Sequence, residues 1–162
     1  MSDMVRKLFS TSFKRWLRGC HANGSTCNGC GIEVIDILTP YYDAERFGMK
    51  RVASPRHADV LLVCGPVTHQ VMPHFRRVYE MVPDPKFVFA VGSCACGGGI
   101  WVDTYKLVGG CDKVVPIDFH VPGHSPRPEV ILDGFAVALG LAPKKVAPVE
   151  EWNAPDQMFR SF

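Results

Sequence analysis

Two short apolar runs, separated by roughly the length of one helix, constrain the fold more than any other feature. They span residues 58–64 and 86–91, and glycine follows each of them. Residues 68–81 lie between them and are predicted to form a helix. Apolar residues recur there and just beyond at helical spacing, so that they share one side of the helix, and they are Val71, Phe75, Val78, Tyr79 and Val82. Buried strands that alternate with helices favour a parallel arrangement. We therefore predict a small α/β domain whose parallel sheet is covered by helices on both faces.

Further elements follow the same alternation. Residues 113–118 form a third apolar run, which is a weaker strand candidate because it contains Pro116. An apolar face also recurs over residues 128–141, and residues 36–47 continue a helix that starts near Cys30. The core domain is expected to span residues 19–142. Residues 143–162 are proline-rich and polar, which predicts an extended C-terminal arm.

Residues 1–18 are expected to form a basic amphipathic N-terminal helix. Its apolar positions recur at helical spacing, and they are Met4, Val5, Leu8, Phe9, Phe13, Trp16 and Leu17. Such a helix either packs on its own domain or docks on a membrane surface or a membrane-embedded partner. No stretch of the sequence approaches the about 18 apolar residues of a membrane span.

Charge and cysteine content narrow the class of function. The formal net charge of +2 is too close to balance for a dedicated nucleic-acid binder. The chain has 7 cysteines, an odd number that a closed disulfide framework would not absorb. The short spacings Cys27-x-x-Cys30 and Cys94-x-Cys96 suit a shared metal better than a disulfide lattice.

The predicted topology brings chemistry-bearing loops to one edge of the sheet. Ligands of open α/β sheets bind outside the carboxyl ends of the strands. Residues 64–68, 92–99 and 121–128 follow the three predicted strands, and they are rich in sulfur, imidazole and glycine. The loop from Cys27 to Cys30 can reach the same edge.

The spacing alone leaves several kinds of site open. Zinc sites, thiol redox pairs and iron–sulfur sites all use a C-x-x-C segment. Glycines around Cys94 and Cys96 let the backbone approach closely and leave amide N–H groups free to bond sulfide. A phosphate cradle is disfavoured, because residues 92–99 contain neither G-x-x-x-x-G-K-[ST] nor G-x-G-x-x-G.

Five separated segments in one order carry a resemblance. They are C-N-G-C-G-I-E at 27–33, A-D-V-L-L-V-C-G-P-V-T at 58–68, G-S-C-A-C-G-G-G at 92–99, G-C-D-K-V-V-P-I-D at 110–118 and P-G-H-S-P-R-P-E at 122–129. Over residues 16–140 the chain resembles the family that unites the 20 kDa subunit of respiratory complex I with the small subunits of [NiFe] hydrogenases. The C-x-G-C-x-x-E segment is more similar to energy-converting membrane-bound hydrogenases and formate hydrogenlyase than to complex I, whose members carry adjacent cysteines.

The resemblance implies a flavodoxin-like domain that holds one [4Fe-4S] cluster at the carboxyl edge of the strands. Cys27, Cys30 and Cys94 fall on three ligand positions of the family. The fourth falls on His124, where the family has cysteine in P-G-C-P-P-R-P-E. A neutral imidazole can ligate iron and would raise the reduction potential. Alternatively His124 does not ligate, and Cys96, a water molecule or an incomplete cluster fills the site.

Other residues have a functional and a structural interpretation. The resemblance places Glu33 between the cluster and the catalytic subunit as a proton-relay carboxylate, whereas a first-turn glutamate is also favoured by the helix dipole. His21 is expected to be structural, and Arg127 to fix its loop or pair across a subunit interface. Three further cysteines are expected to be small buried residues, namely Cys20, Cys64 and Cys111.

The resemblance implies an electron-transfer subunit of a multi-subunit oxidoreductase on the cytoplasmic face of a membrane. Its partners would be ferredoxin-like iron–sulfur subunits, membrane-embedded subunits and a large catalytic subunit. That large subunit is either a [NiFe] hydrogenase subunit or one similar to the 49 kDa subunit of complex I. The alternatives are a relay in a complex I-type NADH or ferredoxin:quinone oxidoreductase and, from another class, a zinc-binding structural module.

Overall fold

The computed structural model describes residues 17–138 of the chain. Most of the expected N-terminal helix and the whole expected C-terminal arm lie outside the described residues. The prediction of a helix over residues 1–18 was wrong at its end, because Leu17 and Arg18 begin strand β1 (Leu17–Asn23). Within residues 17–138, no helix has the length and apolar character needed to cross a membrane.

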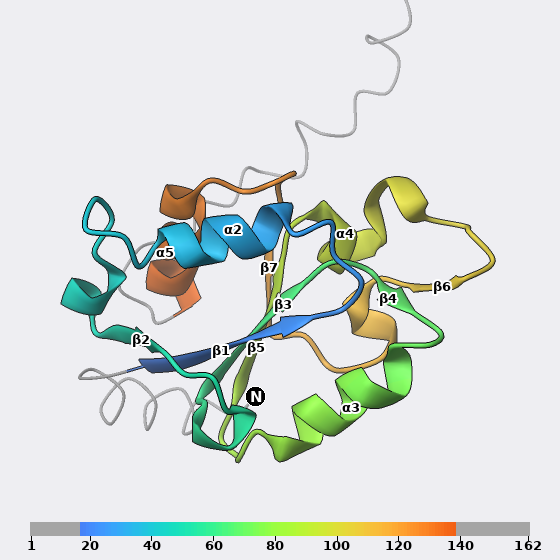
Figure 1. Ribbon diagram of the computed structural model, residues 1–162, viewed down its shortest axis with the longest axis horizontal. Helices are drawn as coiled ribbons and strands as arrows, with labels where there is room; N and C mark the ends of the chain where they lie inside the picture. Colours follow the sequence, from blue (N-terminus) through green and yellow to red (C-terminus); the bar gives the residue numbers. More distant parts are fainter. Residues whose placement is uncertain (1–16, 139–162) are drawn as a thin grey trace, which may run out of the picture.

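A five-stranded parallel sheet forms the centre of the molecule (Figure 1). Besides β1 it contains β2 (Met49–Arg51), β3 (Val60–Cys64), β5 (Phe87–Val91) and β7 (Phe119–Val121). Their order across the sheet is β2-β1-β3-β5-β7, and every neighbouring pair is parallel. Numbered by their sequence within this sheet, the strands run 2-1-3-4-5, which is the flavodoxin-like order. The predicted α/β class is therefore confirmed.

Helices cover both faces of the sheet. Helices α2 (Gly29–Asp36) and α5 (Pro128–Ala138) lie on one face, while α3 (Met72–Met81) lies on the other (Figure 1). Alternate strand residues divide between the faces, as the pleat requires: Leu62 packs with α2 and α5, and Leu61 packs with α3. All residues of β3 and β5 are buried, which explains why these strands read as unbroken apolar runs.

Shorter elements complete the chain. Helix α4 (Ser93–Gly97) follows β5 directly, and strands β4 (Val67–Thr68) and β6 (Leu107–Gly109) form a separate antiparallel pair. Four 3-10 helices occur in the described residues, which are η1 (Ala44–Phe47), η2 (Pro55–His57), η3 (Gly99–Trp101) and η4 (Cys111–Lys113).

The third predicted strand was placed too early. Residues 111–113 form η4, and pairing with β5 begins only at Phe119. Asp118 fixes this point, because its N–H donates to the Val88 carbonyl at 3.0 Å and its carboxylate accepts the Val88 N–H at 3.0 Å. Pro116 has no N–H to contribute to a ladder, so the preceding segment packs as irregular chain.

Two predicted helices also have different bounds. Helix α2 ends at Asp36 rather than continuing to Phe47, and the Thr39 hydroxyl donates to the Asp36 carbonyl at 2.7 Å. Pro40 follows and cannot extend the helical hydrogen bonds, so the second half of the expected helix is reduced to η1. Helix α3 starts at Met72 because Thr68 belongs to β4.

The turn after β3 gives a stability prediction. Gly65 has φ +81°, and a Cβ built there would lie 2.7 Å from the backbone N and Cα of Thr26. We expect Gly65→Ala to lower the free energy of unfolding by at least about 1 kcal/mol, because the left-handed conformation and the close approach both oppose a side chain. Thermal unfolding followed by circular dichroism measures the change.

Gly19→Ala is the matched control, since its Cβ would meet only Leu62 Cδ1 at an ordinary 3.7 Å. Equal stabilities of the two variants would contradict the close approach between Gly65 and the Thr26 backbone.

Candidate metal centre

Three loops converge at the carboxyl edge of the sheet, as the sequence predicts. The loop after β5 is joined to the loop after β7 by backbone hydrogen bonds from Gly92 N to Val121 O and from Ser93 N to Gly123 O, both 2.8 Å. The loop after β1 is tied to the end of β3 by the Gly24 N–H, which donates to Cys64 O at 2.9 Å. These bonds fix the positions of the cysteines that the loops carry.

Cys27 and Cys30 flank the start of helix α2. Cys27 is exposed, whereas Cys30 is the second residue of the helix and only 6% exposed. The turn between them is held by the Asn28 N–H, which donates to Thr26 Oγ1 at 2.9 Å, and Asn28 itself has φ 75°. Cys30 therefore lies at the positive end of the helix dipole, where a thiolate is stabilised.

Cys94 approaches the same place from the other side. It is the second residue of α4 and is 8% exposed. Burial raises the pKa of Cys30, and the nearby thiols of Cys94 and Cys27 raise it further. Burial and then Cys27 likewise raise the pKa of Cys94. The structure thus brings together the three cysteines that the sequence singles out.

Two glycines keep space around the sulfur atoms. A Cβ on Gly92 would lie 2.5 Å from Cys30 Sγ, and a Cβ on Gly99 would lie 2.7 Å from Cys94 Sγ. Both glycines have positive φ, +90° and +58° respectively. Any side chain at either position would occupy the space beside a sulfur atom.

The donor set fits a polynuclear iron–sulfur group. Within residues 17–138, no three His, Cys, Asp or Glu side chains gather closely enough to surround a single metal ion. In a four-iron cluster each thiolate binds a different iron atom, so the ligands stand farther apart than around one ion. The three thiols converge, and Gly92 and Gly99 leave space beside the sulfur atoms of Cys30 and Cys94. This arrangement is compatible with ligands that stand as far apart as those of a four-iron cluster.

The fourth candidate is exposed, like Cys27 and unlike Cys30 and Cys94. His124 is exposed and has no hydrogen bond or ion pair among the described residues. The hydroxyl of the next residue, Ser125, lies beside Gly29 at the start of α2, where it acts against the rise in the pKa of Cys30 that burial causes. Ser125 escaped the sequence analysis, although it stands where the related pattern has proline.

Cys96 also lies near Cys30, but its thiol is hydrogen-bonded to the backbone. Its thiol donates to Ala90 O at 3.6 Å and to Val121 O at 3.9 Å, and burial raises its pKa to about 11. The other three cysteines are buried, as expected: Cys20 is 4% exposed, and Cys64 and Cys111 are fully covered. The Cys111 thiol donates to Gly65 O at 3.4 Å.

The remaining candidates lie around helix α2 and the last loop. Glu33 is half-buried on α2, and its side chain forms no hydrogen bond or ion pair with the described residues. Arg127 has an exposed side chain, while its carbonyl accepts the Val130 N–H at 3.0 Å in the first turn of α5. His21 is half-buried, and its Nε2 is covered and has no partner within residues 17–138. Burial and then Arg51 lower the pKa of His21.

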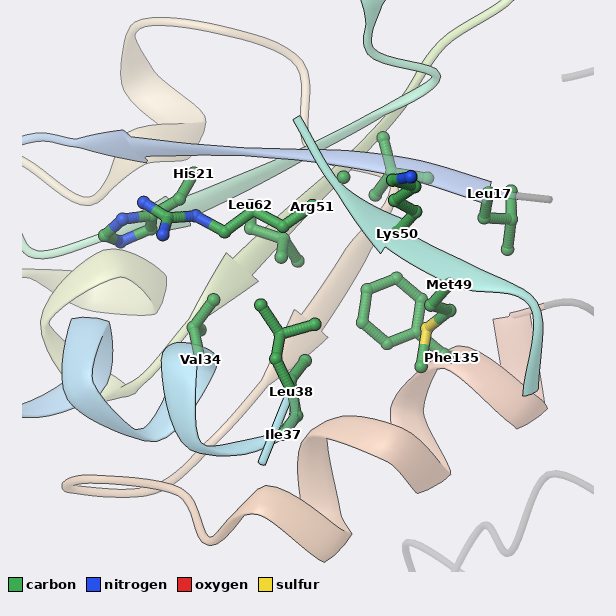
Figure 2. A pocket seen from close by; sticks show the side chains of 12 residues that line it. Leu17, His21, Val34, Ile37, Leu38, Met49, Lys50, Arg51, Leu62 and Phe135 are labelled. Atoms are coloured by element: carbon green, nitrogen blue, oxygen red, sulfur yellow. The ribbon is translucent and has the colours of Figure 1, made fainter. Parts of the chain in front are cut away.

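A mainly apolar pocket lies beside His21 and is separate from the three cysteines. Figure 2 shows Arg51 extending to the end of the pocket where His21 lies. Strands β1 and β2 and helices α2 and α5 supply most of its lining, which includes Leu17, Val34, Ile37, Leu38, Met49, Leu62 and Phe135. No cysteine lines this pocket.

Comparison with known proteins identifies relatives. The sequence profile of the family described as "NADH ubiquinone oxidoreductase, 20 Kd subunit" matches residues 27–138. A probable membrane-bound hydrogenase subunit, mbhJ, of Pyrococcus furiosus is 50% identical over 137 residues, covering 85% of this chain and 80% of that protein. Formate hydrogenlyase subunit 7 of Escherichia coli is 49% identical over 120 residues, covering 74% of this chain and 47% of that protein.

Solved structures agree in fold. A chain of the membrane-bound sulfane sulfur reductase, an archaeal respiratory membrane complex, superposes with a TM-score of 0.71 and 37% identity. That match covers 91% of this chain and 77% of the other. A chain of an NAD⁺-reducing [NiFe]-hydrogenase shares the fold with a TM-score of 0.61 at 19% identity, over 82% of this chain and 96% of the other.

The family match, the identities and the fold confirm the resemblance carried by the five sequence segments. These relatives are subunits of hydrogenases and other oxidoreductase complexes, two of them described as membrane-bound. The chain belongs to the family of the complex I 20 kDa subunit and the [NiFe] hydrogenase small subunits, and it is an oxidoreductase complex subunit.

Proposed function

We propose that the protein is the electron-relay subunit of a membrane-bound, energy-converting [NiFe]-hydrogenase-like complex. It holds one proximal [4Fe-4S] cluster through Cys27, Cys30 and Cys94 and passes electrons to or from a large catalytic subunit. The observation that carries this proposal is the convergence of the three thiols at the carboxyl edge of the sheet, with Gly92 and Gly99 leaving space beside their sulfur atoms.

When bound, the cluster supplies one-electron transfer, and the chain's own residues set its surroundings. Burial of Cys30 and Cys94 excludes water from two ligands, whereas the exposed Cys27 faces outward. The N-terminus of α2 favours negative charge at Cys30. These features hold the group and tune its potential, while bond chemistry belongs to the partner.

The spacing of Cys27 and Cys30 favours a hydrogenase-like complex over complex I. The chain carries C-N-G-C, whereas the complex I pattern has adjacent cysteines, and two hydrogenase-type relatives are 50% and 49% identical to it over the aligned residues. The relative from a sulfane sulfur reductase supports a second candidate, a related complex without hydrogen chemistry. Both candidates place the subunit on the cytoplasmic face of a membrane complex, beside ferredoxin-like and membrane-embedded subunits.

We assign the fourth ligand to His124. It follows Pro122 and Gly123 in the loop that the Ser93 N–H joins to the Cys94 loop through Gly123 O at 2.8 Å. Its imidazole is exposed, as is the thiol of Cys27. Cys96 is a poorer candidate because its thiol is directed toward the Ala90 and Val121 carbonyls.

Glu33 is assigned to proton relay between the cluster and the large subunit. It is half-buried on α2, three residues after Cys30. The same helix exposes Ile32 at 58% and Ile35 at 47%, so the helix that carries Glu33 also presents apolar side chains to a partner subunit.

The purified complex is expected to contain about four irons and four acid-labile sulfides in this subunit, with a reduced-state EPR signal. Serine at Cys27, Cys30 or Cys94 should reduce the iron content, because each substitution removes one thiolate ligand. Elemental analysis measures the loss. Cys20→Ala is the control, since this thiol is buried in β1, and it should retain full iron. Stoichiometric zinc without iron would overturn the assignment in favour of a structural zinc module.

Gly92→Ala should lower cluster occupancy severalfold, because its Cβ would lie 2.5 Å from Cys30 Sγ and φ is +90°. The visible absorption per chain of the purified complex measures occupancy. Gly97→Ala is the matched control in the adjacent helix, since its Cβ would meet nothing within 4 Å. Full occupancy in both variants would mean that the space beside Cys30 is not needed.

His124→Cys should lower the reduction potential of the cluster. A thiolate in place of a neutral imidazole makes the cluster one unit more negative, so it accepts an electron less readily. A redox titration compares the two proteins, with nitrogen hyperfine coupling sought in the wild type. Equal potentials without nitrogen coupling would show that another group completes the site.

A further inference from the structure

The apolar pocket beside His21 lies outside the proposed cluster site, and no cysteine lines it. Strand β2, at the edge of the sheet, and helices α2 and α5 contribute to its walls (Figure 2). Its empty volume is about 410 Å³, part of which is open to solvent. Because only part of this volume is enclosed, the pocket suits one bulky apolar side chain better than a whole cofactor.

The rim of this pocket is positively charged. Lys50 and Arg51 belong to its lining, whereas no acidic residue does. Both side chains are exposed, and within residues 17–138 neither of them forms an ion pair. The pocket is therefore complementary to an apolar side chain that has negative charge beside it.

Two segments outside the described residues differ in how well they match this rim. Residues 1–16 contain four lysines and arginines and one acidic residue, so their charge repels the rim. The sequence E-E-W at 150–152 places two carboxylates directly before a large apolar side chain. Charge complementarity therefore selects residues 150–152 as the occupant.

The chain that leads to Trp152 starts beside the pocket. Phe135 in α5 lines the pocket, and Ala138 follows it by about one helical turn. Trp152 follows Ala138 by 14 residues. An extended chain of that length spans up to about 46 Å, which exceeds the diameter of about 35 Å expected for a domain of this size. Trp152 is thus within reach of the pocket.

We propose that residues 150–152 dock at this pocket of the same chain, with Trp152 entering it and Glu150 and Glu151 pairing with Lys50 and Arg51. Burial of the indole supplies most of the binding free energy, because exposed ion pairs contribute little. The charges select the segment. The docked segment covers the end of the sheet at β2, which pairs only with β1.

Zero-length carbodiimide cross-linking of the purified complex tests the contact. This reagent joins an amine to a carboxylate that touches it, so peptide mass spectrometry should find Lys50 linked to Glu150 or Glu151. The yield should fall severalfold in Trp152→Ala, which removes the apolar anchor. Asp84 and Lys86 form an ion pair at 3.5 Å, and their link is the internal positive control.

Hydrogen–deuterium exchange of the same complex gives a second readout. Trp152→Ala should speed the exchange of the backbone amides of β2 severalfold, because the docked segment shields this strand. Trp101→Ala is the matched control, since Trp101 is 52% exposed on η3 and does not line the pocket. It should leave the exchange of β2 unchanged.

Charge reversal distinguishes docking from misfolding. Arg51→Glu should weaken the protection of β2, less strongly than Trp152→Ala does. Adding Glu151→Arg to that variant should restore the protection, because the pair is rebuilt with its charges exchanged.

The outcomes are independent of iron content, so this inference and the proposed function stand or fall separately. A link from Lys50 to residues 1–16, to a second copy of this chain or to another subunit would overturn the inference in favour of that occupant. It would equally be overturned if Lys50 formed no link while Asp84 and Lys86 did, and Trp152→Ala left the exchange of β2 unchanged.

Discussion

Parallel pairing of β1, β3, β5 and β7 is the constraint on which the candidate metal centre depends. Parallel strands point their carboxyl ends the same way, so the loops that follow them meet at one edge. Each strand except β2 and β3 delivers part of the site: β1 leads to Cys27 and Cys30, β5 to Cys94, and β7 to His124 and Ser125. The buried apolar faces that stabilise the sheet thereby also fix the positions of the sulfur atoms.

Glycine provides the second requirement, which is space. Bringing three thiols together without a bound group raises the pKa of the buried ones, through burial and mutual repulsion. Metal binding has to displace their protons, so iron affinity is coupled to pH. Gly92 and Gly99 leave the neighbourhood of Cys30 and Cys94 free of side chains, which allows a group larger than one ion to approach the sulfur atoms.

The strongest sequence signals predicted the parts of the fold that depend on burial alone. Strands β3 and β5 are central and covered on both faces, so each reads as an unbroken apolar run. Strand β1 was mistaken in part for helix, because Leu17 continues a helical apolar pattern from the preceding residues and Arg18 continues their basic character. The predicted position of strand β7 was wrong because a long-range hydrogen bond between Asp118 and Val88 sets where the strand starts. The residues around Asp118 alone do not reveal such a contact.

The candidate site was predictable to a similar extent. Motif spacing pointed to the pairs Cys27–Cys30 and Cys94–Cys96, the family resemblance singled out Cys27, Cys30 and Cys94, and topology predicted that their loops converge. Local sequence could not show that His124 is exposed while the Ser125 hydroxyl lies beside Gly29, since that depends on how Gly123 and Pro126 anchor the loop. Anomalous X-ray scattering at the iron edge from crystals of the intact complex tests the central claim most directly. The account predicts a compact group of iron peaks bonded to Cys27, Cys30 and Cys94, whereas no iron at this edge of the sheet would contradict it.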